Sequence, residues 1–193
     1  MYTPPRGKIV EMLRTRMSDE RFHHSLEVEK EAMRLAAHYG EDWHRAGLAG
    51  LLHDFCRCDD PSWQLEYMRG RSVKLSEEWL RNPQIWHGPC AAAFLRGELG
   101  IRDREILLAV RFHSTCRPGA SGLEKVVFLA DKVEGGRKHA YAKELRAAAY
   151  RSLDEALYLE MKQSLARACK SGLPLVKEAC GAYNKLATTK RKG

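Results

Sequence analysis

The sequence predicts an all-α protein with a single domain. Apolar residues recur at spacings of three and four along most of the 193 residues, which is typical of amphipathic helices. Runs of alternating apolar and polar residues, which would indicate strands, are missing, and no composition break or internal repeat divides the chain. We therefore expect one helical domain over residues 1–187 and a basic, disordered tail over residues 188–193.

Start and stop signals place the individual helices. Pro4-Pro5 precede the first apolar stripe, Ser18 can cap a second helix, and Gly40 would end it. Asp42 can cap a third helix, which runs through an apolar stretch to His53-Asp54. The other expected helices occupy residues 61–70, 76–81, 103–113 and 123–131, together with one that begins at 87 and ends around 97–100, and a helical C-terminal third covers 139–187 with breaks near 151–152 and 172–174. Its apolar stripes are expected in the core: Leu145, Ala149, Leu157, Met161, Leu165, Leu175, Ala179 and Tyr183.

Helical periodicity also predicts which polar side chains point inward. His24 shares a face with the apolar residues of its helix, whereas the neighbouring His23 lines up with charged ones. His113 falls on the apolar stripe of its helix, and Asp131 comes at the end of a strongly apolar helix. We therefore expect the side chains of His24, His113 and Asp131 to face the interior and that of His23 to face water.

Six inward ionisable residues are the main functional clue. The pair His53-Asp54 follows the apolar run 46–52, and His24, His87, His113 and Asp131 come one each from other predicted helices. An unpaired buried charge is costly, so these groups need a compensating partner. A divalent metal is a suitable one, and mixed His and Asp ligation favours iron, manganese, cobalt or zinc over magnesium or calcium.

The six residues exceed what one metal needs. His24, His53, Asp54 and Asp131 can complete a single site. The economical explanation for the remaining His87 and His113 is a second metal bridged to the first by Asp54. The alternative is that these two histidines bind phosphate as imidazolium donors.

The composition of the chain limits the classes of ligand and the location that we expect for the protein. A net charge of +8 suits a polyanionic substrate such as a nucleotide. Nucleic acid is the weaker option, because the sequence has no zinc finger, RRM signature or alternating basic and aromatic stretch. No apolar run approaches the roughly 20 residues of a membrane span, and no signal-peptide pattern is present, so a cytoplasmic location with six free cysteines is expected. Whether the chain forms a homodimer is left open.

The order of these residues resembles the HD-domain metal-dependent phosphohydrolases, whose signature is a distant His, a His-Asp pair and a distant Asp. The sequence looks most like the YqeK-type branch, the bacterial symmetrical diadenosine tetraphosphate hydrolases. The matching stretches are residues 21–26, 49–54, 87–89, 113–118, 123–137 and 182–184. The resemblance thus covers nearly the whole chain.

The resemblance implies an HD-domain fold with a central metal site that hydrolyses diadenosine tetraphosphate to two ADP through a metal-activated hydroxide. The implied metal ligands are His24, His53, Asp54, His87, His113 and Asp131, around two ions expected to be iron. His53, Asp54 and Arg57 form the expected catalytic set. The candidates for holding the phosphate chain are Arg57, Ser114, Thr115, Arg117, Lys132 and Arg137.

Three positions depart from the family pattern. Arg57 stands where lysine is common and can bind phosphate bidentately. Cys116 stands where glycine is common, a residue that could serve a positive φ, and Gly135 stands where proline is common. Two other functions stay open: a nucleotidase or nucleoside triphosphate hydrolase on the same metal scaffold, and a non-catalytic nucleotide- or RNA-binding module.

Overall fold

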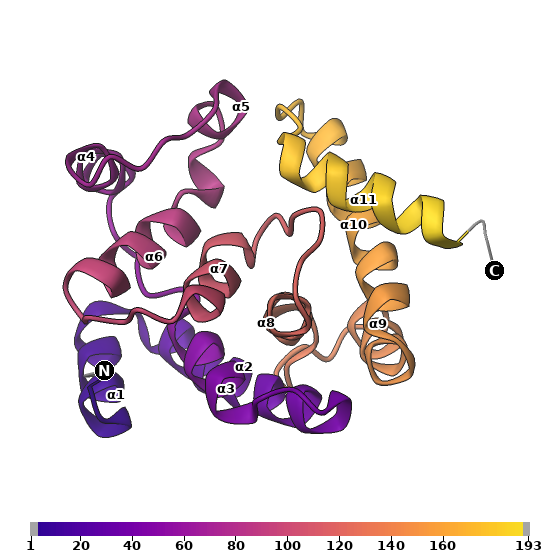
Figure 1. Cartoon of the computed structure of the whole chain (residues 1–193), viewed down its shortest axis with the longest axis horizontal. Coiled ribbons are helices and arrows are strands. Elements are labelled where there is room, and N and C mark those ends of the chain that lie inside the picture. The colour runs from indigo at the N-terminus through magenta and orange to yellow at the C-terminus, as the bar shows by residue number, and fades with distance from the viewer. Residues whose placement is uncertain (1–3, 191–193) are drawn as a thin grey trace.

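A computed structural model describes residues 4–190 of the chain, and this part contains helices and no strands. The all-α prediction is therefore confirmed for these residues (Figure 1). The elements are α1 (Arg6–Arg16), α2 (Asp19–Tyr39), α3 (Trp43–Leu52), α4 (Pro61–Gly70), α5 (Glu77–Leu80), the 3-10 helix η1 (Pro83–Ile85), α6 (His87–Gly97), α7 (Arg104–Phe112), α8 (Gly122–Val133), α9 (Ala140–Arg151), α10 (Leu153–Lys170) and α11 (Lys177–Lys190). No helix in the described range is long and apolar enough to cross a membrane.

Helix α8 is the centre of the packing. It contacts α2, α3 and α7 on one side and α9 and α10 on the other, and Figure 1 shows it between these two groups. Val126, Val127, Leu129 and Ala130 are fully buried, so α8 needs apolar residues on most of its circumference. Asp131 near its C-terminal end is therefore delivered into the interior.

Capping residues fix the helix boundaries close to those predicted. The Ser18 hydroxyl accepts from the amide of Arg21, and Asp42 accepts from the amides that begin α3. Gly40 ends α2 with a φ of 70°, which is unfavourable for residues with a side chain. These caps set where α2 ends and α3 begins, and thereby the relative positions of His24 and His53.

Two glycines allow helix pairs to approach closely. A Cβ on Gly50 would lie 3.0 Å from the carbonyl oxygen of Val28, so α3 rests directly on α2. A Cβ on Gly88 would lie 2.7 Å from the carbonyl oxygen of Arg111, so α6 rests equally closely on α7. Both pairs carry predicted metal ligands, and the glycines keep those ligands within reach of each other.

Two expectations for the C-terminal third need correction. Helix α11 continues through Lys190, and the hydroxyls of Thr188 and Thr189 donate to carbonyls four residues earlier within it, so the first part of the expected tail is helical. Residues 191–193 lie outside the described part. Leu175 was expected in the core but is 36% exposed, because it precedes α11 and the helical spacing used for it does not apply; Val176 is buried instead.

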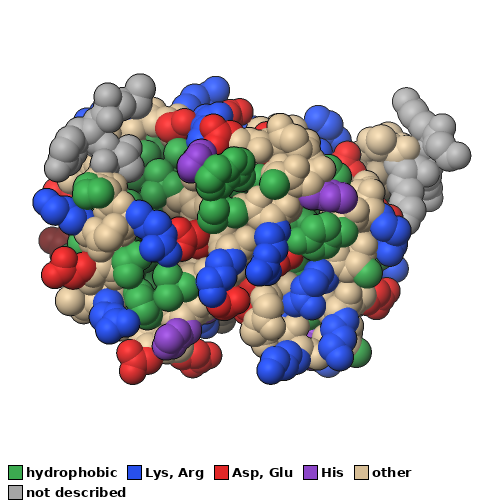
Figure 2. All heavy atoms as spheres, turned by 90° about the horizontal axis from the view of Figure 1, so that it is seen from below, with side chains coloured by type: hydrophobic (Ala, Val, Ile, Leu, Met, Phe, Trp, Pro, Cys, Tyr) green, Lys and Arg blue, Asp and Glu red, His purple; other side chains and the backbone are tan. Residues whose placement is uncertain are grey.

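Basic and acidic side chains share the face of the protein drawn in Figure 2. On the face seen in Figure 2, Lys and Arg side chains alternate with Asp and Glu side chains around apolar and His groups. This face therefore offers no continuous basic stripe of the kind that tracks a nucleic-acid backbone.

Candidate metal centre

The end of α3 brings two adjacent ligand candidates to one place. The helix stops at Leu52, and His53 and Asp54 lie in the turn that follows, where neighbouring side chains are not forced about 100° apart as they are within a helix. Both residues are buried. This is the shoulder position that allows a His-Asp pair to face a single site.

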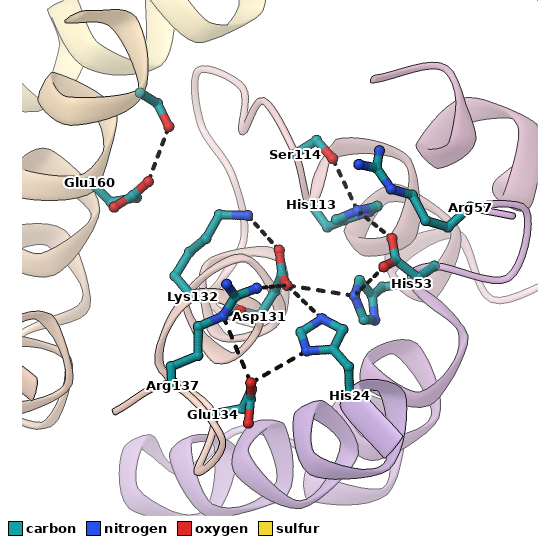
Figure 3. Close-up of polar contacts among 12 residues, drawn as sticks. His24, His53, Arg57, His113, Ser114, Asp131, Lys132, Glu134, Arg137 and Glu160 are labelled. Atoms are coloured by element: carbon teal, nitrogen blue, oxygen red, sulfur yellow. Dashed lines mark hydrogen bonds and ion pairs between the residues drawn. The ribbon is translucent and has the colours of Figure 1, made fainter. Parts of the chain in front are cut away.

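All six predicted ligands converge from the ends or inner faces of five helices. The Nε2 atom of His24 lies 2.9 Å from Oδ1 of Asp131, and that of His53 lies 3.7 Å from the same oxygen. Asp54 lies close to the other three histidines. Its Oδ2 is 3.5 Å from Nε2 of His53, and its Oδ1 is 3.3 Å from Nε2 of His87 and 3.5 Å from Nε2 of His113. Figure 3 shows the labelled members pointing toward one another.

Asp54 connects two ligand sets. His24, His53 and Asp131 form one compact group of donor atoms, and His53, Asp54 and His113 form another. His87 extends the second group, because its Nε2 lies 3.0 Å from Nε2 of His113. Asp54 presents one oxygen to His53 and the other to this second pair, as a bridging carboxylate would.

The orientation of the rings fits metal binding. Nδ1 of His53 donates to the carbonyl of Gly50 at 2.7 Å, and Nδ1 of His113 donates to the carbonyl of Val110 at 2.7 Å. These bonds place the proton on Nδ1 and leave the Nε2 lone pair facing the cluster, which is the usual arrangement of a metal-bound histidine. Nε2 of His53 is buried without a hydrogen-bond partner in the described part of the chain. A metal ion would satisfy this atom, so the residues present fit the group.

Electrostatics keep the two carboxylates charged and the His53 and His87 rings neutral. Burial opposes ionisation, but the surrounding imidazoles, His53 first, hold the pKa of Asp54 well below its ordinary value. Lys132 and His24 do the same for the pKa of Asp131. Burial lowers the pKa of His53 to about 4. Charged carboxylates beside neutral imidazoles are the protonation states that metal ligation requires.

His24 and His87 differ from His53 and His113 in the partners of their ring nitrogens. Burial opposes protonation of His24, but the hydrogen bond and charge of Asp131 outweigh it and raise the pKa of His24. Arg57 lies 3.0 Å from Nδ1 of His87 and also donates to the carbonyl of Gln84 at 2.7 Å. Because a guanidinium only donates, Nδ1 of His87 accepts and the ring proton lies on Nε2, so His87 could ligate a metal through Nε2 only once Arg57 releases Nδ1.

The predicted phosphate-binding residues divide into two groups. Ser114 lies at the cluster, with its hydroxyl oxygen 3.0 Å from Nε2 of His113. Lys132 pairs with Asp131, and Arg137 lies 3.6 Å from Asp131, so both cations sit beside the ligands (Figure 3). Arg57 is held against His87, as described above.

Arg117 and Thr115 are placed differently. Arg117 makes a bidentate ion pair with the buried Glu124, at 2.6 and 2.7 Å, and makes no polar contact with the described cluster residues. Thr115 is buried, and its hydroxyl donates to the carbonyl of Cys116. Cys116 has a φ of 57°, which confirms that this position uses the backbone conformation favoured by glycine.

Two residues of the site were not singled out from the sequence. Glu134 lies 3.4 Å from Nδ1 of His24 and is buried, so it can orient that ring. Arg21 lies 3.4 Å from Oδ2 of Asp54 and balances part of the negative charge. Both lie within stretches that match the family pattern, but nothing in their local spacing distinguished them from ordinary surface charges.

The cluster opens onto two cavities. One, of about 360 Å³, lies between the α7–α8 connection and α10–α11, and Ser114, Thr115, Ile85, Met161 and Leu165 contribute to its wall. The other, of about 450 Å³, lies on the α2 side, and its lining includes His24 and Arg137. The first is largely apolar with some amide and hydroxyl groups, and the second is lined mainly by charged side chains.

The fold and the site together define an all-α protein with a buried His/Asp cluster that could hold a metal ion. The HD domain family model matches residues 21–136, and the chain belongs to the HD domain family. A relative from Halalkalibacterium halodurans, named a symmetrical bis(5'-nucleosyl)-tetraphosphatase, is 32% identical over 183 residues, covering 94% of this chain and 96% of its own. A relative of the same name from Staphylococcus aureus is 34% identical and covers 92% of this chain and 89% of its own.

A solved structure agrees with the fold. The crystal structure of a protein from Clostridium acetobutylicum, described as a predicted HD superfamily hydrolase involved in NAD metabolism, superposes with a TM-score of 0.93. It is 32% identical and covers 97% of this chain and 99% of its own. The likeness therefore extends over the whole helical domain and includes helices α9 to α11 beyond the matched family segment.

Proposed function

We propose that this protein is a metal-dependent hydrolase that converts diadenosine tetraphosphate to two ADP. The observation that carries the proposal is the buried His/Asp cluster, in which Nε2 of His53 lacks a hydrogen-bond partner among the described residues; one cavity is lined by Ser114 beside the cluster and another by His24. Full-length relatives named symmetrical bis(5'-nucleosyl)-tetraphosphatases support the choice of substrate.

The cluster residues would hold the metal. His24, His53, Asp54 and Asp131 are the ligands we assign to one ion, and His87 and His113, with the second oxygen of Asp54, to another. We expect iron, with manganese, cobalt or zinc as the other metals compatible with imidazole and carboxylate donors. When bound, a divalent metal lowers the pKa of water to near neutrality and neutralises charge on phosphate.

The remaining residues position the phosphate chain. Lys132, Arg137 and Arg57 present cations at the rim of the cluster, and Ser114 adds a hydroxyl donor. Water attacks one of the two central phosphorus atoms, and the bond from that phosphorus to the central bridging oxygen breaks. One ADP takes the water oxygen and the other keeps the bridging oxygen. We do not include Arg117 in this set, because Glu124 already occupies its guanidinium.

A substrate with two nucleosides suits a centre with two flanking cavities. The cavity beside Ser114 has apolar walls for one adenine ring, and the cavity beside His24, lined by three basic and three acidic side chains, leaves room for the second nucleoside. A central cut of the phosphate chain follows if one nucleoside lies on each side of the metals. No strong general acid is needed for this cut, because ADP is a tolerable leaving group.

We place the enzyme in the cytoplasm, where its nucleotide substrate is found. Size-exclusion chromatography with light scattering would establish whether it forms a homodimer. Neither property is used in the assignment of the reaction.

The test is chromatographic analysis of products from diadenosine tetraphosphate with freshly purified, iron- or manganese-loaded protein. We expect ADP alone, and a loss of at least about 100-fold in Asp54→Asn, because even changes to residues behind metal ligands cost about 10- to 100-fold. Asp154→Asn is the control, since Asp154 is exposed and pairs with Lys125 away from the cluster.

The other outcomes identify the alternatives. AMP with ATP would refute the central cut. Cleavage of mononucleotides but not of the dinucleotide would indicate a nucleotidase or nucleoside triphosphate hydrolase. No turnover, together with strongly salt-dependent RNA binding, would favour the binding module.

A further inference from the structure

The largest cavity described in the protein lies away from the metal centre. It has a volume of about 860 Å³ and is formed by α6, α7 and the end of α4. We call it the arginine cavity, because five of its lining residues are Arg71, Arg96, Arg102, Arg104 and Arg111. No Asp or Glu is among the lining residues. A concave site with one sign of charge concentrates counter-ions of the opposite sign.

Most of this positive charge is not neutralised by the protein. Arg71 pairs with Glu98, and Arg102 donates to the backbone carbonyl of Arg96. Arg96 and Arg104 make no ion pair with any residue between positions 4 and 190. At least two exposed guanidinium groups are thus available to a ligand.

Arg111 differs from the exposed arginines because it is half-buried. Its guanidinium carbon lies 5.4 Å from the ring centroid of Phe112, and burial lowers the pKa of Arg111 against the smaller opposing effect of the Glu178 charge. A partly desolvated cation gains more from an added anion than one fully in water, because screening by solvent is weaker there. Arg111 therefore marks the deeper end of the cavity as the place for a strongly charged group.

The rest of the lining is apolar. Ala92 and Ala93 of α6 face Leu107 and Leu108 of α7 across the cavity, and Val73 lies on the α4 side. Arginines around an apolar floor suit a ligand that combines phosphate groups with a flat, weakly polar ring. The volume lies within the range of small-molecule sites, about 300 to 1,000 Å³.

The arginine cavity is separate from the two cavities at the metal centre. It shares no lining residue with either of them. Its residues on α7, at positions 104, 107, 108 and 111, recur at helical spacing on a face different from that of positions 106, 110 and 113, which are buried toward the core. A ligand bound there would not occupy the reaction site.

We propose that the arginine cavity is a second, non-catalytic binding site for a nucleoside diphosphate or a similar nucleotide with adjacent phosphate groups. The diphosphate lies against Arg96, Arg104 and Arg111, where guanidinium groups form bidentate hydrogen bonds to phosphate oxygens. The base lies on the apolar floor. The proposal does not depend on which reaction the metal centre catalyses.

The test is titration calorimetry of the metal-loaded protein with ADP at physiological ionic strength. We compare the wild type with Arg96→Glu/Arg104→Glu and with Lys8→Glu/Lys162→Glu, a control with the same change of net charge at exposed lysines that make no ion pair within residues 4–190. We expect wild type and control to bind one more ADP per chain than the arginine variant, or to bind it at least about tenfold more tightly. We also expect pyrophosphate to compete for this ADP and adenosine not to.

Several results would overturn the proposal. Equal ADP stoichiometry and affinity in all three proteins would do so, as would extra binding that appears only in a parallel titration well below physiological ionic strength, in the manner of a diffuse charge effect. Preferential, arginine-dependent binding of a short RNA over ADP would show that the cavity serves nucleic acid instead. Because the comparison is of an additional ADP between variants, it is valid even if the metal centre does not hydrolyse the dinucleotide.

Discussion

Substituting Gly88 by alanine should separate α6 from α7 and displace the histidines that these helices supply. The new Cβ would lie 2.7 Å from the carbonyl oxygen of Arg111, whereas ordinary contacts begin at about 3.4 Å. The clashing atom belongs to a helix backbone and cannot rotate away, so the helices must part by up to about 0.7 Å. Overpacking of this kind costs about 1 to 3 kcal/mol, offset by less than about 1 kcal/mol from the better helix propensity of alanine.

The same displacement should reduce activity as well as stability. Nε2 of His87 and Nε2 of His113 are 3.0 Å apart, and a shift near 0.7 Å is large on that scale. A misplacement of about 1 Å can cost about 100-fold in rate, so we expect roughly a 10- to 100-fold loss. Thermal unfolding followed by circular dichroism should show a fall in Tm of roughly 2 to 8 °C for a chain of this size.

Gly7→Ala is the matched control, because a Cβ on Gly7 of α1 would meet nothing within 4 Å. It should raise stability by roughly 0.5 to 1 kcal/mol and leave activity unchanged. If Gly88→Ala matched this control in both Tm and rate, the claim that the α6–α7 spacing positions the two histidines would be wrong.

Two further predictions concern the loop and the ligands. Cys116→Gly should be more stable than Cys116→Ala by about 1 kcal/mol in denaturant unfolding, the reverse of the usual order, because only glycine adopts a φ of 57° without strain; equal stability would remove the argument for strain. Acidification should destabilise the metal-free protein: the pKa of His53 is about 4 in the fold against 6.5 for an ordinary histidine, so the unfolded chain binds the extra proton as pH falls from 6.5 towards 4. The contribution of neutral His53 to the free energy of unfolding is fully present above pH 6.5. At pH 5 the unfolding free energy falls through this group by on the order of 2 kcal/mol at most. His53→Gln should show a smaller fall in Tm between pH 7 and pH 5, and an unchanged fall would contradict the assignment.

The helices and their ends could be predicted because their signals are local. Ser18 and Asp42 bond to amides only two or three residues away, and Gly40 ends its helix through its own φ. The inward direction of His24 and the exposed direction of His23 follow from periodicity within one helix. The HD domain match confirms the family inferred from the order of the ligand residues.

Side-chain partners across the fold could not be predicted in this way. Arg117 follows a ligand-bearing helix by a short turn, which suggested phosphate binding, but Glu124 engages its guanidinium and also accepts from the amide of Ser121. Arg21 and Glu134 reach the cluster only because α2, α3 and the end of α8 meet there. The contacts of Arg21 and Glu134 depend on packing between segments more than 30 residues apart, for which spacing along the chain gives no signal.

The helix pair α6 and α7 joins the two parts of the molecule that matter most for function. Its inner side supplies His87 and His113 to the metal centre, and its outer side forms most of the arginine cavity. Because Gly88 lets the backbones touch, there is no soft layer of side chains at that point to absorb a change in helix spacing. A nucleotide held between Arg96 of α6 and Arg104 of α7 would depend on the same α6–α7 distance that Gly88→Ala increases. Occupancy of the arginine cavity should therefore change the rate at the metal centre, and the effect should disappear in the Arg96→Glu/Arg104→Glu variant.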